Sequence, residues 1–246
     1  MCSVTLRRHK IDDVVRVAAS AGLSCVEWGA DRHVPPGDAT AADRARDACA
    51  EAGLRVSSYG SYFRAGVHDA ASFAPVLASA RRLGAPRIRI WAGDQGSGRA
   101  TAQWRDAVVR TSRLVAEQAA DGGVSVAFEF HGGTLTDDSA STLALLDDID
   151  HASVGTYWQP PVGVPDDVAL DGLRIVLPHV AAVHVFSWWP GEHRRPLPAR
   201  AAMWRRAFDS LRTAGRDVDA LLEFVPGDDA DVVGREARAL AELTGS

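Results

Sequence analysis

Residues 124–136 read V-S-V-A-F-E-F-H-G-G-T-L-T, and this stretch decides how the rest of the chain is interpreted. Its first part alternates small or polar side chains with bulky ones, which is typical of a β-strand whose two faces meet different surroundings. Glu129 and His131 stand at the end of this alternation, just before Gly132 and Gly133. A carboxylate at the end of an apolar strand is costly to bury unless something positive compensates it. The pattern therefore indicates a functional site at the carboxyl end of a strand.

Length, composition and charge narrow the class of protein. The chain has 246 residues, 46% of them hydrophobic and 24% charged, which suits one α/β barrel of an ordinary globular protein. A net charge of −5 argues against a broad phosphate-binding surface, so we expect no nucleic-acid partner. No apolar run is long enough to span a membrane, and the N-terminus does not resemble a signal peptide. We expect one cytoplasmic domain, residues 1–246, with no membrane contact.

The cysteines support the same compartment. Cys2, Cys25 and Cys49 are odd in number and show no C-x-x-C spacing. They fit buried thiols in a reducing cytosol better than a disulfide framework or a structural zinc site.

Short apolar runs alternate along the chain with amphipathic stretches rich in Ala, Arg and Asp. The predicted strands are 3–6, 25–29, 55–59, 87–91, 124–131, 153–158, 180–186 and 221–225. The predicted helices lie near 11–21, 40–52, 69–83, 101–121, 137–148, 166–177, 199–214 and 229–243. Repeated strand-then-helix units predict an α/β fold, a (βα)₈ TIM barrel. The alternative is a doubly wound open sheet, but no Gly-rich nucleotide fingerprint follows the first strand.

Four successive predicted strands each deliver one oxygen or nitrogen donor near the same end. These donors are Glu129, Gln159, His184 and Glu223. In a barrel the carboxyl ends of all strands meet at one face, where barrel enzymes carry out chemistry. Two carboxylates, an imidazole and an amide oxygen suit one divalent metal ion such as Mn²⁺, Mg²⁺ or Co²⁺, with Zn²⁺ as a further option. Alone, His184 would more often be a hydrogen-bonded core histidine, but the joint pattern favours a metal centre.

Aromatic side chains crowd the same predicted rim. Tyr59, Trp91 and Trp188 are candidates for an apolar wall against a sugar-like substrate, and packing against helices is the alternative for each. Alternation places Trp28 and Trp158 on the outer face of their strands.

Polar residues on the loops and inner faces complete the set of candidates. His33 could reach the mouth of the site, and His131 could contact substrate or support a metal ligand. Arg194 could hold an anionic substrate, although loop arginines are usually solvated. Glu27 and Arg89 both fall on inward positions, which predicts a buried ion pair inside the barrel.

These motifs resemble the sugar phosphate isomerase/epimerase group, the xylose isomerase-like TIM barrels, over nearly the whole chain. The resemblance rests on C-V-E-W-G, R-V-S-S-Y-G-S-Y, R-I-R-I-W-A-G, F-E-F-H-G-G-T-L-T, T-Y-W-Q-P, V-H-V-F-S-W and L-L-E-F-V. The ketose epimerases of that superfamily bind one divalent metal through Glu, Asp, His and Glu on the last four strands. By resemblance Glu129, His184 and Glu223 take three of these places. Gln159 stands where the family has Asp, which implies weaker metal affinity.

The sequence therefore predicts a metal-dependent isomerase or epimerase acting on a small sugar-like carbonyl compound. The metal would stabilise an ene-diolate while Glu129 and Glu223 serve as base and acid, an assignment that rests partly on the resemblance. Two alternatives stay open: a metal-dependent hydrolase or lyase using the same cluster, and a non-catalytic sugar-binding barrel in which Gln159 has weakened the site. A homo-oligomer is compatible with such a barrel, but no stretch identifies an interface.

Overall fold

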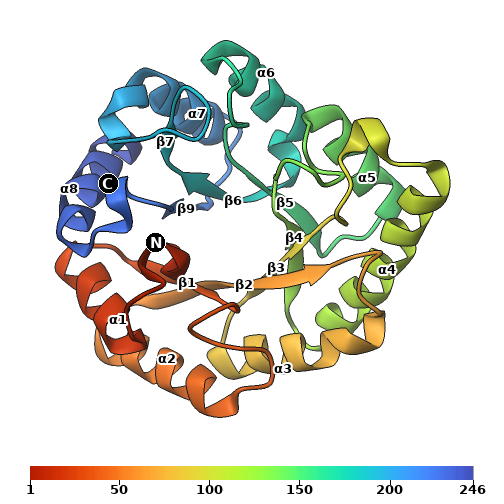
Figure 1. The fold of residues 1–246 in the computed structure, drawn as a ribbon, viewed down its shortest axis with the longest axis horizontal. Coiled ribbons are helices and arrows are strands. Elements are labelled where there is room, and N and C mark those ends of the chain that lie inside the picture. The colour runs from red at the N-terminus through yellow and green to blue at the C-terminus, as the bar shows by residue number, and fades with distance from the viewer. Residues whose placement is uncertain (246) are drawn as a thin grey trace.

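A ring of parallel strands enclosed by helices is the main feature of the computed structural model, which describes residues 1–245 (Figure 1). Within these residues the barrel sheet has the order β1-β2-β3-β4-β5-β6-β9, and every neighbouring pair is parallel. The strands are β1 (Cys25–Gly29), β2 (Arg55–Arg64), β3 (Arg87–Trp91), β4 (Ser125–Phe128), β5 (Val154–Trp158), β6 (Val180–Val185) and β9 (Asp219–Leu222). The predicted α/β barrel in one domain is confirmed, as a nearly closed seven-stranded ring.

Helices follow the strands and form the outer layer (Figure 1). They are α1 (Ile11–Ser20), α2 (Ala39–Glu51), α3 (Ala74–Leu83), α4 (Ala102–Asp121), α5 (Ser139–Ile149), α6 (Asp166–Val176), α7 (Ala201–Thr213) and α8 (Ala230–Thr244). Side chains of Asp38, Thr101 and Asp138 accept hydrogen bonds from the first-turn amides of α2, α4 and α5. The described helices do not include one that combines the length and apolar character needed to cross a membrane.

The predicted first strand, residues 3–6, is wrong. Ser3–Leu6 forms a 3₁₀ helix, η1, and the barrel is closed there by the two preceding residues. The Cys2 amide donates to the Leu222 carbonyl at 3.0 Å, and the Glu27 amide donates to the Met1 carbonyl at 2.9 Å. A single parallel bridge between Cys2 and Glu27 therefore joins β9 to β1.

Buried hydroxyl groups explain why this segment turns. The Gly29 amide donates to Ser3 Oγ at 2.8 Å, and the Phe224 amide donates to Thr5 Oγ1 at 3.0 Å. Side-chain oxygens thus satisfy donors that the backbone of an extended strand would otherwise satisfy. Residues 3–6 therefore stay between β9 and β1 without forming further strand-to-strand hydrogen bonds.

Two other predicted strands extend too far. The fifth was expected to reach residue 131, but β4 ends at Phe128, and the His131 amide turns back to the Thr136 carbonyl at 3.1 Å. The last was expected over 221–225, but β9 ends at Leu222. Beyond these ends the alternation of faces no longer fixes where a side chain points.

The main hydrophobic core lies between the barrel and the helices. Trp28 and Trp158 are fully buried in it, as the alternation predicted, and the Trp158 ring packs edge-on against Trp204 of α7 at 5.9 Å. A smaller cluster fills the inside of the ring and includes Tyr157 and Leu221. The cysteines are free and buried, in agreement with the expectation of reduced thiols.

Gly66, in the turn after β2, tests how tightly that turn packs on α4. Its φ is +80°, and a Cβ there would lie 2.7 Å from Val108 Cγ2 and 3.1 Å from Val108 backbone atoms. Gly66→Ala should lower the free energy of unfolding by about 3 kcal/mol, because left-handed strain and overpacking add. Gly22→Ala is the matched control, since Gly22 has φ +74° but open space around it, and should cost about 1 kcal/mol. Equal losses in urea denaturation would show that the contact with Val108 does not matter.

Candidate active site

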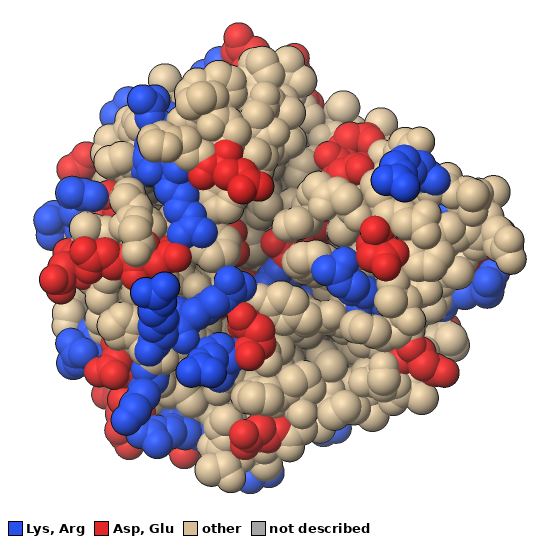
Figure 2. Space-filling model, in the orientation of Figure 1, with Lys and Arg blue, Asp and Glu red and all other residues tan. Residues whose placement is uncertain are grey.

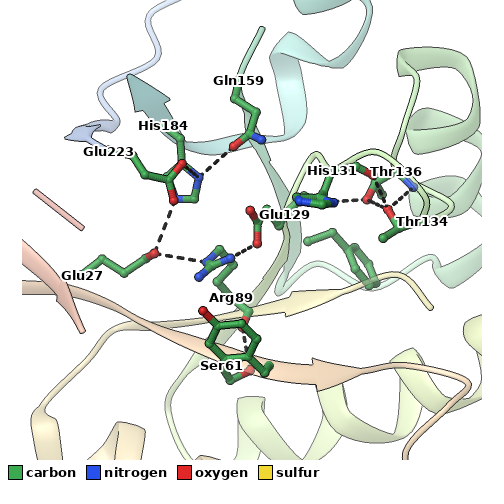
Figure 3. Close-up of polar contacts among 12 residues, drawn as sticks. Glu27, Ser61, Arg89, Glu129, His131, Thr134, Thr136, Gln159, His184 and Glu223 are labelled. Atoms are coloured by element: carbon green, nitrogen blue, oxygen red, sulfur yellow. Dashed lines mark hydrogen bonds and ion pairs between the residues drawn. The ribbon is translucent and has the colours of Figure 1, made fainter. Parts of the chain in front are cut away.

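The four predicted metal ligands come together at the carboxyl ends of neighbouring strands (Figure 3). Glu129 follows β4, Gln159 follows β5, His184 lies on β6 and Glu223 follows β9. All four are buried, with exposures between 0% and 8%. Ligand atoms of Glu129, His184 and Glu223 all lie within 4.8 Å of one another. The barrel topology therefore places donors from distant parts of the sequence around one point.

Both nitrogens of the His184 ring face polar side chains of the cluster. Its Nδ1 lies 2.9 Å from Gln159 Oε1 and 3.4 Å from Glu223 Oε2, while its Nε2 lies 3.5 Å from Glu27 Oε1. A histidine that binds a metal through one nitrogen usually turns its other N–H toward a carboxylate. The Gln159 amide oxygen can only accept, so Nδ1–H donates to it in this arrangement. A cation bound at Nδ1 would require the other tautomer, with Nε2–H facing Glu27. Two carboxylates, one imidazole and one amide oxygen fit a hard or borderline divalent ion.

Arg89 of β3 connects this cluster to the floor of the barrel (Figure 3). Its Nε donates to Glu27 Oε1 at 3.1 Å, which confirms the predicted buried ion pair. Its Nη1 also contacts Glu129 Oε2, a contact that the sequence did not predict. Gly60 makes room, because a Cβ there would lie 2.7 Å from Arg89 Nη2 and 3.0 Å from Glu27 Oε1. One guanidinium therefore serves two buried carboxylates.

Charges around Glu27 shift its titration strongly. Burial raises the pKa of Glu27, but the Arg89 guanidinium, the nearby His184 ring and the hydrogen bond from Ser58 outweigh burial, so the pKa lies far below its usual 4.5. Burial lowers the pKa of Arg89, but the carboxylates of Glu27 and Glu223 raise it by more than burial lowers it. The guanidinium therefore stays charged. At neutral pH, Glu27 and Arg89 therefore form a charged ion pair at the floor of the site.

A cavity of about 410 Å³ opens above the cluster, and the face of the molecule in Figure 2 is hollowed near its centre. Its lining residues are Glu129, Phe130, His131, Gly132, Asp137, Gln159, Pro161, Val162, Val164, Phe186, Trp188, Glu192, Glu223 and Phe224. Acidic and basic side chains are mixed on that face. Three of the predicted ligands, Glu129, Gln159 and Glu223, therefore line one cavity with aromatic walls, large enough for a small substrate. His184 is fully buried and is not among the lining residues.

His131 lines the cavity with its tautomer fixed. Its Nδ1 lies 2.7 Å from the Gly132 carbonyl oxygen, which can only accept, so Nδ1 carries the hydrogen and Nε2 keeps a lone pair. The His131 ring stacks on the Trp91 ring, with centroids 4.5 Å apart. The Arg64 guanidinium lies over the Trp91 ring, 4.0 Å from its centroid. Burial is the main cause that lowers the pKa of His131. Trp91, predicted as a substrate contact, is placed against the His131 ring and is not among the residues that line the cavity.

A hairpin brings Trp188 and Arg194 to the rim. It pairs β7 (Ser187–Trp188) with β8 (Arg194–Arg195). Trp188 lines the cavity, as expected of a substrate contact. Arg194 forms an ion pair with Asp228, and its guanidinium lies 5.3 Å from the Trp188 ring centroid. The positive charge of Arg194 is therefore already paired with a carboxylate at the rim.

Two predicted substrate contacts lie away from this cavity. His33 Nε2 donates to the His9 carbonyl at 3.2 Å, its ring packs on Trp28, and burial lowers its pKa. The Tyr59 hydroxyl donates to the Val34 carbonyl at 2.7 Å, within the core between barrel and helices. The structure corrects both expectations: His33 lies on a loop at the surface of the core, and Tyr59 faces outward by strand alternation. We no longer expect either to contact substrate.

Other lining residues were missed from the sequence. Phe186 and Phe224 fall within predicted strands, and neither Asp137 nor Glu192 was predicted to line the site. Phe186 and Phe224 lie just beyond the ends of β6 and β9, while Asp137 and Glu192 lie in loops. Periodicity gives no direction at any of these positions. Their place in a loop after a barrel strand was the one signal available.

The comparison with protein families identifies the fold group. A model of the xylose isomerase-like TIM barrel matches residues 15–185. The chain belongs to this family. A curated 3-dehydroshikimate dehydratase from Bacillus anthracis is 26% identical over 165 residues, covering 63% of this chain and 58% of that relative. The matched part therefore spans a little over half of the relative's length.

Solved structures share the fold at low sequence identity. The probable 3-DHS dehydratase involved in petrobactin synthesis from Bacillus anthracis has a TM-score of 0.82, 19% identity and coverage of 98% of this chain and 97% of that chain. D-psicose 3-epimerase from Clostridium cellulolyticum H10 has a TM-score of 0.74, 15% identity and coverage of 96% and 93%. A xylose isomerase-like TIM barrel protein from Mycobacterium smegmatis in complex with magnesium has a TM-score of 0.67, 18% identity and coverage of 98% and 91%. These likenesses concern the fold.

Acid should remove the stabilising effect of Glu27. Because its folded-state pKa lies below its usual 4.5, the carboxylate stabilises the fold above that pH and loses this effect as the pH falls below it. Glu27→Gln should cost about 3–5 kcal/mol at pH 7, since Arg89 loses a buried partner. In urea titrations the difference between wild type and variant should shrink as the pH falls below about 4.5. A difference independent of pH would contradict the ion pair.

Gln159 offers a direct test of the metal centre. Gln159→Asp should tighten Mn²⁺ or Mg²⁺ binding by about tenfold or more, because a charged oxygen replaces a neutral one. Calorimetric titration of the metal into chelator-treated protein measures this. Gln103→Asp on the exposed surface of α4 adds the same charge elsewhere and should change nothing. Equal affinities in all three proteins would remove Gln159 from the ligand set.

Proposed function

We propose that this chain is a divalent-metal-dependent lyase that removes a proton next to a carbonyl group in a small hydroxylated substrate and then eliminates water. One observation carries this proposal: the buried donors Glu129, Gln159 and Glu223 line one cavity with His131, whose Nε2 is left as an acceptor. His184 lies in one cluster with Glu129 and Glu223. Carbonyl activation and a positioned base are the two requirements for removing such a proton.

The four donors would hold the cation. When bound there, a divalent ion would polarise the substrate carbonyl and stabilise the negative charge that forms when the proton leaves. The magnesium complex of a structural relative with the same fold supports this choice of cofactor.

His131 is the base in this proposal. Its Nδ1–H donates to the Gly132 carbonyl, so Nε2 takes the proton from the carbon next to the carbonyl. The electron pair of that C–H bond forms a double bond as the C–O bond on the adjacent carbon breaks. The imidazolium then gives its proton to the departing hydroxyl, and one water leaves. Stacking on Trp91 holds the ring plane during both transfers.

The contact between Arg89 and Glu129 favours elimination over epimerisation. Two-base epimerisation needs Glu129 and Glu223 to alternate between carboxylate and acid in each turnover. Glu129 makes its ion pair with Arg89 only as a carboxylate, so each protonation would break a buried contact. Elimination through His131 leaves that pair intact. The similarity to a 3-dehydroshikimate dehydratase supports the same reaction class.

Epimerisation of a sugar-like ketone, the reaction expected from the sequence, is the second candidate. It is favoured by the two carboxylates within one ligand cluster and by the likeness to D-psicose 3-epimerase. Epimerisation would exchange the substrate proton with solvent without loss of water. The cytoplasmic location and a homo-oligomer remain predictions.

The test combines substrates with a variant of the base. With Mg²⁺ or Mn²⁺, the protein should convert 3-dehydroshikimate into an aromatic dihydroxybenzoate, followed by ultraviolet absorbance, and chelation should stop the reaction. His131→Gln should reduce kcat on the order of a hundredfold or more with an unchanged melting temperature. His179→Gln, in the 3₁₀ turn before β6, is the control and should keep full activity.

Other outcomes point elsewhere. Deuterium uptake into D-psicose or D-fructose without dehydration of 3-dehydroshikimate would replace the lyase by an epimerase. Full activity of His131→Gln would remove His131 as the base. Metal binding without turnover of any of these compounds would favour the non-catalytic sugar-binding barrel.

A further inference from the structure

Phe224 directly follows the candidate ligand Glu223 and has an unusual backbone. Its φ is +51°, in the left-handed region that bulky residues rarely adopt. Such strain costs free energy and persists only where the surrounding structure imposes it. Backbone strain of this kind is often found at functional sites.

The left-handed turn changes where the Phe224 ring points. In an extended strand, consecutive side chains face opposite sides, so a strand that directs Glu223 inward would direct Phe224 into the helix layer. Because β9 ends at Leu222 and Phe224 leaves the extended region, Glu223 and Phe224 both line the cavity. The strained residue thus adds an aromatic ring beside a metal ligand.

Contacts from distant segments hold Phe224 in this conformation. Its amide donates to the buried Thr5 Oγ1 at 3.0 Å. Its ring lies 5.6 Å from the Trp188 ring, and the Arg194 guanidinium covers it at 4.6 Å. Phe186 continues the surface, 4.8 Å from Trp188. These rings form one wall of the cavity, defined here as Phe186, Trp188 and Phe224.

We infer that this wall receives the flat face of a six-membered ring, and that Phe224 selects cyclic substrates over open-chain polyols. Tilted aromatic rings give extended contact to a planar apolar face, whereas an open-chain polyol presents hydroxyl groups in all directions. The cavity of about 410 Å³ suits one such ring. The inference rests on the proposed function for the place of the chemistry, and it adds the substrate class and the residue that selects it.

Binding of two inert compounds tests the inference without turnover. Shikimate is a cyclic hydroxylated carboxylate, D-gluconate is an open-chain one, and neither carries the ketone that the proposed reaction needs. In calorimetry with Mg²⁺-loaded protein, shikimate should bind at least about tenfold more tightly than gluconate. Phe224→Leu should weaken shikimate binding about three- to tenfold and leave gluconate unchanged, because only the flat ring contact is lost. Phe224→Tyr keeps the ring and should keep the affinity.

A glycine variant separates the ring from the fold. Phe224→Gly removes both the ring and the strain. The relief of strain offsets part of the lost ring packing, so the variant should remain folded while losing shikimate selectivity. Equal affinity of the wild type for the two compounds, no shikimate binding, or an equal loss for both in Phe224→Leu would overturn the inference. Absence of dehydratase turnover with selective shikimate binding would instead refute the proposed reaction alone.

Discussion

The buried charge of Arg89 is the interaction on which the site depends. Its guanidinium contacts Glu27 and Glu129, while Glu27 also faces His184. Several carboxylates could not be buried together in the barrel interior without a compensating cation. Arg89 supplies this charge from β3, and Gly60 on the neighbouring strand leaves the space it needs. The candidate metal site is therefore built on an ion pair that stands below it.

Barrel closure is linked to the same region. Residues near the N-terminus replace a strand by a short bridge, and their hydroxyls bind backbone donors at the ends of β1 and β9. Thr5 in this way fixes the conformation of Phe224, next to Glu223. A segment that is irregular by strand criteria thus supports both the ring and one wall of the cavity. Irregular structure at this end of a barrel is where specificity is usually set.

The contacts of the side chains in the cavity indicate a different role for each group. Among the polar donors, Glu129 is paired with Arg89. His131 is held against Trp91, with one nitrogen hydrogen-bonded to the backbone. Phe186, Trp188 and Phe224 supply the aromatic part of the lining. This separation of charge, base and apolar surface supports a reaction in which one positioned imidazole moves the proton and the carboxylates remain ligands.

The sequence alone determined the barrel, the four convergent donors and the Glu27–Arg89 pair, because strand alternation and the common carboxyl face of parallel strands are properties of local pattern and fold class. The tertiary structure alone decided where strands end and what happens beyond them. The left-handed turn of Phe224, the 3₁₀ segment at residues 3–6 and the reach of Arg89 to Glu129 each depend on partners far away in the chain. The hydrogen bond from the Tyr59 hydroxyl to the Val34 carbonyl likewise joins separate segments of the chain. A periodic pattern carries no information about such partners, because a hydrogen bond between distant segments exists only once the ring has closed.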